Sequence, residues 1–334
     1  MTKTIRVGVY GASGYAGQDL IQILSEHPNV ELIFATSNTY AGEFVPATDL
    51  RYIPSANPPL ENVDAIFLAL PHKASAPIAK KGLDAGLKVI DLSADLRLDS
   101  AEAYEKWYEV EHPHPEMLPV PYGLPELHRD KIAGVQAVAV PGCYPTATLL
   151  GLYPLLRIEG LSLDAPIIVD AKSGVTGAGR TPTDKTHFVE AYGNIVPYNA
   201  GRAHRHVGEI EQEIHKFMDI SEPLIFTPHL VPIDRGLMTS IYVSLGYALS
   251  SDKVDSLYAN VYADEPMVRL MPLGSHAQFK GVVKTNRCHI SITPVTDRYI
   301  HITSVIDNLR KGASGQAVQC FNLMFDLPET EALL

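Results

Sequence analysis

The stretch Thr4-Ile-Arg-Val-Gly-Val-Tyr-Gly-Ala-Ser-Gly-Tyr-Ala-Gly17 decides the first half of the fold. Its apolar beginning predicts a buried strand, and the apolar spacing from Tyr15 to Glu26 predicts a helix. A glycine turn between a strand and a helix is what a dinucleotide pyrophosphate site requires. Gly11 permits the tight turn, Gly14 lets the pyrophosphate approach the backbone, and Gly17 lets the helix pack closely on the sheet. The spacing is GxxGxxG rather than GxGxxG, so an ordinary turn is the alternative.

The end of the second predicted strand, Val30 to Thr36, bears on the choice of cofactor. An NAD-preferring site usually carries Asp or Glu here, which binds the ribose hydroxyl. This chain has Ser37 and Asn38 instead, which leave room for a 2′-phosphate, although both could simply cap a loop. The sequence therefore favours NADP(H). The predicted cofactor-binding residues in this half of the chain are Gly11, Ser13, Gly14, Tyr15, Ala16 and Ser37.

Later apolar runs predict further strands of a parallel sheet. Val63 to Leu70 is continuously apolar, as expected for a central parallel strand, and Ala74 to Ala85 has the pattern of a crossover helix. Lys88 to Leu92 predicts the next strand. Arg97 follows it and is a candidate anion ligand, because a guanidinium group matches phosphate oxygens in a bidentate way. An exposed surface arginine is the alternative.

The segment Val140-Pro-Gly-Cys-Tyr-Pro-Thr-Ala147 places a cysteine between a strand and a helix. Val135 to Val140 predicts a buried strand, and Ala147 to Leu156 has helical spacing, with Pro145 suited to a first turn. Cys143 therefore lies at the positive end of a helix dipole, which lowers the pKa of a thiol and supplies N–H groups for an oxyanion. Such a cysteine can attack an acyl carbon, whereas a buried structural cysteine is the alternative.

The second half of the chain predicts an α+β domain. Pro166 to Lys172 predicts a strand, and a glycine-rich and hydroxyl-rich segment after it ends in Arg180. Thr181 to Ala203 shows little periodicity and predicts a long loop, which is usually functional in a compact domain. In later segments apolar residues alternate strictly with other residues, as in antiparallel strands with one buried face. The predicted fold class is therefore α/β, with a Rossmann-type dinucleotide-binding domain and an α+β domain that contains an extended, largely antiparallel sheet.

Two histidines are the leading candidates for a base that serves Cys143. His204 and His206 follow the predicted loop and precede a helix that runs to Phe217, and their spacing leaves open which one faces the cysteine. Zinc binding is not predicted, because residues two apart on a helix do not share a face and no carboxylate-rich motif is nearby. Of the other cysteines, Cys288 and Cys320 lie in apolar patterns that predict core positions.

Composition excludes some classes of protein. The chain has 334 residues, 46% of them hydrophobic, which suits two domains with sizeable cores. Its net charge of −11 argues against a general affinity for nucleic acid or anionic lipid. Three cysteines without framework spacing, and no signal-like or membrane-length apolar run, lead us to expect a cytoplasmic protein.

Six motifs together resemble one family. They are Gly11-Ala-Ser-Gly-Tyr-Ala-Gly17, Asp91-Leu-Ser-Ala-Asp-Leu-Arg97, Pro141-Gly-Cys-Tyr-Pro-Thr-Ala147, Gly174-Val-Thr-Gly-Ala-Gly-Arg180, His204-Arg-His206 and Asp307-Asn-Leu-Arg-Lys-Gly312. In this order they resemble the N-acetyl-gamma-glutamyl-phosphate reductases of arginine biosynthesis. The more distant relatives of that family are the aspartate-semialdehyde dehydrogenases. A sister family, which reduces a carrier-linked aminoadipyl phosphate, tends to have Asn-Ala where this chain has Tyr144-Pro145. Gly208 departs from the proline that the family often has there.

The resemblance implies NADPH-dependent reduction of an acyl phosphate to an aldehyde and phosphate. It implies that Cys143 is the nucleophile and His204 the acid/base, and that the Asn308 region returns to the nicotinamide. Arg97, Arg180 and His206 are then expected to bind the substrate and its phosphate. The expected domains are 1–142, rejoined by a C-terminal helix in 308–334, and 143–307 for catalysis and oligomerisation. We expect a homo-oligomer, a dimer or a tetramer, and no metal.

Overall fold

The computed structural model describes residues 4–334, which fall into two compact units. The first unit runs to Gly142 and includes Ala313–Leu334, and the second is Cys143–Gly312. The sequence assigned 308–312 to the first domain, whereas the structure includes these residues in the second unit.

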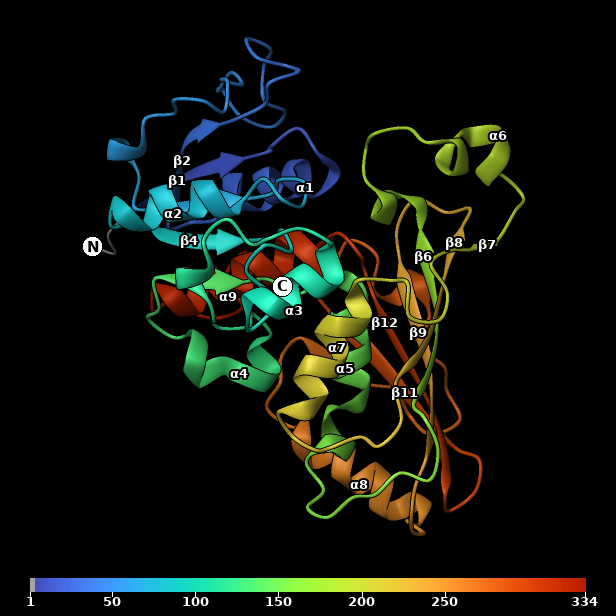
Figure 1. Ribbon diagram of the computed structural model, residues 1–334. Helices are drawn as coiled ribbons and strands as arrows, with labels where there is room; N and C mark the ends of the chain where they lie inside the picture. Colours follow the sequence, from blue (N-terminus) through green and yellow to red (C-terminus); the bar gives the residue numbers. More distant parts are fainter. Residues whose placement is uncertain (1–3) are drawn as a thin grey trace. The chain divides into compact units, whose positions relative to one another are not determined.

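The first unit is built on a parallel sheet in the order β2-β1-β3-β4-β5. Because β3 is central, all of its residues are buried, as its continuous apolar run predicted. The last helix packs against α1, α4 and β4, so the C-terminal segment completes this unit (Figure 1). The strands are β1 (Ile5–Tyr10), β2 (Val30–Ala35), β3 (Ala65–Leu68), β4 (Lys88–Asp91) and β5 (Ala137–Ala139), and the helices are α1 (Tyr15–Ser25), α2 (Ala76–Asp84), α3 (Ala101–Tyr108), α4 (Pro125–Ile132) and α9 (Gly315–Met324).

The second unit is built on a mixed sheet in the order β10-β11-β12-β9-β6-β8-β7. The pairs β6–β8 and β10–β11 are parallel, and the other neighbours are antiparallel, which confirms the predicted largely antiparallel sheet. The strands are β6 (Ile168–Gly174), β7 (Val196–Pro197), β8 (Ile225–Val231), β9 (Leu237–Ser244), β10 (Val268–Leu270), β11 (Cys288–Pro294) and β12 (Tyr299–Ile306), and the helices are α5 (Cys143–Leu156), α6 (Phe188–Ala191), α7 (His206–His215) and α8 (Ser251–Val261).

Helix α5 is the centre of the second unit, and it is buried on almost every side. It packs against β9, β12 and α7 (Figure 1). A glycine permits the close approach to the sheet, because a β-carbon at Gly151 would lie 2.7 Å from Cδ1 of Ile241. Ile241 therefore faces α5. Tyr242 faces the opposite side of the sheet, since neighbouring residues of a strand alternate.

The segment predicted as a long loop contains short regular elements. Within Thr181 to Ala203 the chain forms a one-turn 3₁₀ helix at Asp184–Thr186, then α6 and β7, and another one-turn 3₁₀ helix at Val175–Ala178 precedes this segment. These elements are too short for a hydrophobic period to reveal them. Helix α7 begins at His206, before Gly208, so the missing proline does not disturb its start. In the described part of the chain, no helix is long and apolar enough to cross a membrane.

Candidate active site

The glycine turn of the first unit has the backbone geometry that was predicted for Gly11 and Gly17. Gly11 adopts φ of 69°, and a β-carbon there would lie 2.2 Å from the carbonyl oxygen of Ala69. A β-carbon at Gly17 would lie 2.3 Å from the oxygen of Gly11, so α1 packs directly on the turn. Gly14 differs, because a β-carbon there would meet only the oxygen of Gly11, at 3.5 Å. The protein itself therefore leaves the space beside Gly14 open.

The start of α1 suits a phosphate group. Gly14 is the N-cap residue, and no side chain of the described residues caps the helix there. The first N–H groups of a helix lack intrahelical partners and attract anions. Tyr15 and Ala16 follow in the first turn of the helix, with Tyr15 on the surface. The turn and the helix start together fit a dinucleotide pyrophosphate.

Ser37 lies at the end of β2, beside this turn. Its hydroxyl lies 2.8 Å from that of Ser13 and accepts a hydrogen bond from the N–H of Tyr40 at 3.2 Å. The amide oxygen of Asn38 accepts from the N–H of Ser55 at 2.9 Å, so Asn38 does shape a loop, as the alternative held. The two serine hydroxyls stand where a cofactor ribose is expected.

Arg97 is buried in the first unit rather than exposed on its surface. Its Nε donates to the carbonyl oxygen of Val140 at 2.7 Å, and its Nη2 donates to that of Leu92 at 2.8 Å. Arg97 thus holds the backbone that leads from β5 towards Cys143. Its predicted role as a phosphate ligand stays a prediction.

Cys143 is the first residue of α5 and is partly exposed, whereas Cys288 and Cys320 are fully buried. The ring of the next residue, Tyr144, contacts both candidate histidines. The ring centroid of Tyr144 lies 5.6 Å from that of His204 and 5.9 Å from that of His206. The structure thus brings the cysteine segment and the His204-Arg-His206 motif together around one aromatic ring.

A pair of tyrosine hydroxyls completes this cluster. The hydroxyl of Tyr198 donates to that of Tyr144 at 3.1 Å, and Tyr144 donates to the carbonyl oxygen of His229 at 3.5 Å. Burial raises the pKa of both tyrosines, and negative charge at Cys143 raises it further. Both hydroxyls are therefore protonated at physiological pH. Sequence reasoning missed Tyr198, because it comes from the segment without periodicity.

The half-buried ring of His204 is neutral at physiological pH. Burial, and then the charge of Arg205, lower the pKa of His204 to about 4. Its Nδ1 lies 3.2 Å from the backbone N–H of His206 and accepts a hydrogen bond from it. In the neutral ring the proton therefore resides on Nε2, because Nδ1 is already an acceptor. The Nε2–H of His204 is therefore a hydrogen-bond donor. Such a donor can stabilise an oxyanion, whereas it cannot accept the proton of a thiol.

Asn308 lies in the second unit, just beyond β12. Its amide oxygen accepts from the N–H of Gly236 at 2.8 Å, and its amide nitrogen donates to the hydroxyl of Thr176 at 2.9 Å. Thr176 belongs to the glycine-rich segment that ends in Arg180, which is exposed. Asn308 is thus tied to that segment, and its predicted contact with a nicotinamide stays a prediction.

No group of three or more His, Cys, Asp or Glu in residues 4–334 could hold a metal ion.

Comparison with known proteins defines the class of the chain. Residues 6–135 match the family described as "Semialdehyde dehydrogenase, NAD binding domain", and residues 143–308 match "Semialdehyde dehydrogenase, dimerisation domain". The fold is that of aspartate semialdehyde dehydrogenases. It matches the Vibrio cholerae enzyme II in complex with ASA with a TM-score of 0.76 at 19% identity, over 97% of this chain and 99% of that one. It matches the Candida albicans enzyme with NADP with a TM-score of 0.71 at 16% identity, over 96% and 98%.

Full-length relatives narrow the class. N-acetyl-gamma-glutamyl-phosphate reductase from Desulforudis audaxviator is 44% identical, over 99% of this chain and 98% of the relative. The enzymes of that name from Moorella thermoacetica and Desulfotalea psychrophila are 43% and 45% identical, each over 98% of both chains. The chain belongs to the N-acetyl-gamma-glutamyl-phosphate reductase family within the semialdehyde dehydrogenases. This confirms the resemblance drawn from the six motifs.

Proposed function

We propose that the protein reduces N-acetyl-gamma-glutamyl phosphate to N-acetyl-glutamate semialdehyde and phosphate, with NADPH as reductant and Cys143 as nucleophile. The observation that supports it best is the place of Cys143 at the start of α5, with Tyr144 linking it to the two histidine rings. The name shared by the full-length relatives supplies the substrate.

The reaction divides into two easier steps. The thiolate of Cys143 attacks the acyl carbon, a C–S bond forms, and the bond to the phosphate oxygen breaks. When bound, NADPH supplies a hydride to the thioester carbon. The oxyanion that results is held by N–H groups at the start of α5 and by the Nε2–H of His204. Collapse of this oxyanion breaks the C–S bond and releases the aldehyde and the thiolate.

The remaining assignments follow the charges. Arg97, Arg180 and His206 are assigned to the substrate and its phosphate, as the family resemblance implies. Gly11, Ser13, Gly14, Tyr15 and Ala16 hold the cofactor pyrophosphate, Ser37 lies at its ribose, and Asn308 contacts the nicotinamide. The open space at Gly14 and the uncapped start of α1 support the cofactor part of this proposal.

The test is the reverse reaction, phosphate-dependent oxidation of N-acetyl-glutamate semialdehyde with NADP. We expect activity in the wild type, and almost none in Cys143→Ser with NADPH binding preserved, because serine is a much weaker nucleophile at neutral pH. Aspartate semialdehyde and the carrier-linked aminoadipate semialdehyde serve as competing substrates. Preference for either of these substrates would overturn the proposed substrate assignment. More than a few per cent of wild-type activity in Cys143→Ser would overturn the assignment of Cys143 as the nucleophile.

We also propose that the protein forms a homodimer through the face of the mixed sheet that α5 does not cover. Ile225, Ile168, Tyr242 and His301 stand directly opposite one another on β8, β6, β9 and β12, so they share that face. The first three are 39–45% exposed, and the rings of Tyr242 and His301 stack at 4.9 Å. The family match of this unit to a dimerisation domain supports a second copy of the chain as the occupant.

A further inference from the structure

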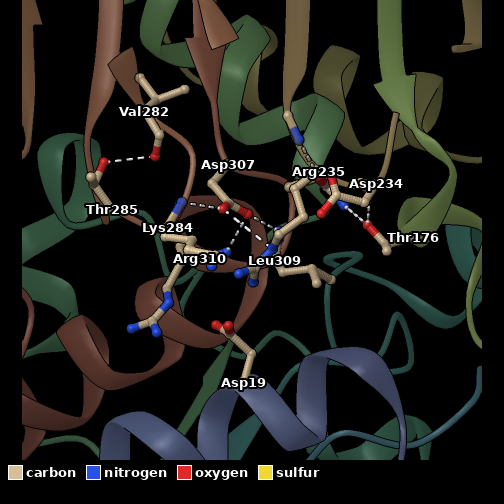
Figure 2. Close-up of polar contacts among 12 residues, drawn as sticks. Asp19, Thr176, Asp234, Arg235, Val282, Lys284, Thr285, Asp307, Leu309 and Arg310 are labelled. Atoms are coloured by element: carbon tan, nitrogen blue, oxygen red, sulfur yellow. Dashed lines mark hydrogen bonds and ion pairs between the residues drawn. The ribbon is translucent and has the colours of Figure 1, made fainter. Parts of the chain in front are cut away.

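A buried aspartate at the end of β12 joins several segments of the second unit (Figure 2). Oδ1 of Asp307 accepts hydrogen bonds from the N–H groups of Leu309 and Arg310 at 2.8 and 3.1 Å. Oδ2 accepts from the N–H of Lys284 at 2.6 Å and lies 3.4 Å from Nε of Arg235. One fully buried carboxylate therefore fixes the turn after β12 against two other loops.

This turn leads directly to the nucleophile. The carbonyl oxygen of Asp307 accepts a hydrogen bond from the N–H of Gly312 at 2.9 Å. Gly312 passes so close to Cys143 that a β-carbon on it would lie 2.8 Å from Cβ of Cys143 and 3.3 Å from its Cα. The backbone of Gly312 thus forms the wall behind the Cys143 side chain. The position of that wall is set by the turn that Asp307 holds.

The same turn carries Asn308, whose amide is held on both sides by Gly236 and Thr176. The Thr176 hydroxyl donates in turn to the carbonyl oxygen of Asp234 at 2.6 Å (Figure 2). The neighbouring residue, Arg235, pairs with Asp307. The aspartate therefore couples the glycine-rich segment after β6 to the turn beside Cys143.

We propose that Asp307 is a positioning residue for Cys143. Its carboxylate fixes the turn from 307 to 312, and through Gly312 it fixes the direction in which the thiol points. The effect on turnover rests on the proposed function, whereas the effect on thiol reactivity does not. A displacement of about 1 Å in a reacting group can cost about 10²-fold in rate, so a small shift of this wall is enough to matter.

The first test compares Asp307→Asn with Glu213→Gln. Asp307→Asn places an amide NH₂ opposite N–H or guanidinium donors, which loosens one side of the turn. Glu213 is a matched control, because it is fully buried in the same unit and pairs with Lys216 at 2.6 Å. We expect Asp307→Asn to lower kcat about 10²-fold with little change in KM, and to slow alkylation of Cys143 by iodoacetamide at every pH. Glu213→Gln lowers Tm but keeps the alkylation rate.

The second test adds a methyl group to the wall itself. Gly312→Ala pushes against Cys143, whereas Gly151→Ala pushes against Ile241 further along α5, at a comparable 2.7 Å. We expect slower alkylation in Gly312→Ala alone. A folded Gly312→Ala with the wild-type alkylation rate overturns the proposal, as does Glu213→Gln slowing alkylation as much as Asp307→Asn.

The two readouts separate this proposal from the proposed function. If the wild type reduces no acyl phosphate while Gly312→Ala still slows alkylation, the substrate is wrong and the positioning role stands. If Asp307→Asn does not fold, Gly312→Ala against Gly151→Ala decides the question.

Discussion

The partial burial of His204 has a direct consequence for the pH dependence of the reaction. Its pKa of about 4, below the usual value of 6.5, keeps the ring neutral until the medium is strongly acidic. If the neutral ring is the active form, kcat/KM stays level as pH falls through 6 and declines only near 4. The pH profile of the reverse assay measures this, with thermal stability recorded at each pH. A decline of kcat/KM near pH 6.5 that disappears in His204→Asn would contradict the assignment of the neutral His204 ring as the active form.

Substitutions at the same position separate a hydrogen-bond donor from a titrating acid/base. We expect His204→Asn to lose ~10²–10⁴-fold in rate and His206→Asn to lose much less. His204→Gln places an amide donor near the position of Nε2, so we expect it to retain more activity than His204→Asn. Single-turnover kinetics measure the chemical step directly. If His206→Asn shows the larger loss, the two histidines have exchanged roles.

We expect the cofactor preference to depend on Ser37. The hydroxyls of Ser13 and Ser37 lie 2.8 Å apart and bring no negative charge to the predicted ribose site. We expect the wild type to prefer NADPH, and Ser37→Asp to shift the preference towards NADH, because a carboxylate binds ribose hydroxyls and repels a 2′-phosphate. Ratios of kcat/KM for the two cofactors measure this. Equal efficiency in the wild type would show that Ser37 does not select the cofactor.

Elements with a clear local period were predictable, and elements without one were not. The sequence located β1, α1 and the start of α5 because a strand, a glycine or proline turn and a helix follow one another directly. It missed α3 and β8, and it missed α6 and β7 inside the supposed loop. For the same reason Cys143 was predictable from its own segment. Tyr198 and Asp307 were not, because only tertiary pairing brings them to it.

The glycine turn and α1 offer a prediction that distinguishes packing from ligand binding. At Gly17 a methyl group meets backbone atoms within 2.3–2.9 Å, so Gly17→Ala should lower the free energy of unfolding by about 1–3 kcal/mol. At Gly14 it has room, so Gly14→Ala should keep its stability and lose NADPH binding. Denaturant unfolding and fluorescence titration with NADPH measure the two effects. If Gly14→Ala binds NADPH with wild-type affinity, the cofactor pyrophosphate does not bind beside Gly14.

For the whole molecule, two sheets of different kinds explain why one chain carries two family matches. The parallel sheet is covered by helices and buried, whereas the mixed sheet packs α5 on one face only. Along that sheet the exposed and buried residues alternate, as at Ile241 and Tyr242. The sequence showed this alternation but not the lateral register, which aligns the exposed side chains of distant strands into one row.

That row makes the oligomeric state testable. A charge at Tyr242 or Ile168 would be desolvated if the face is covered by a second copy, and burying an unpaired charge is costly. We therefore expect Tyr242→Asp and Ile168→Asp to dissociate the dimer in sedimentation velocity, while each chain stays folded by circular dichroism. Phe44→Asp is the control, because Phe44 is 64% exposed in the first unit. A dimer that survives both Tyr242→Asp and Ile168→Asp would show that the interface lies elsewhere. A monomeric wild type would exclude the proposed homodimer.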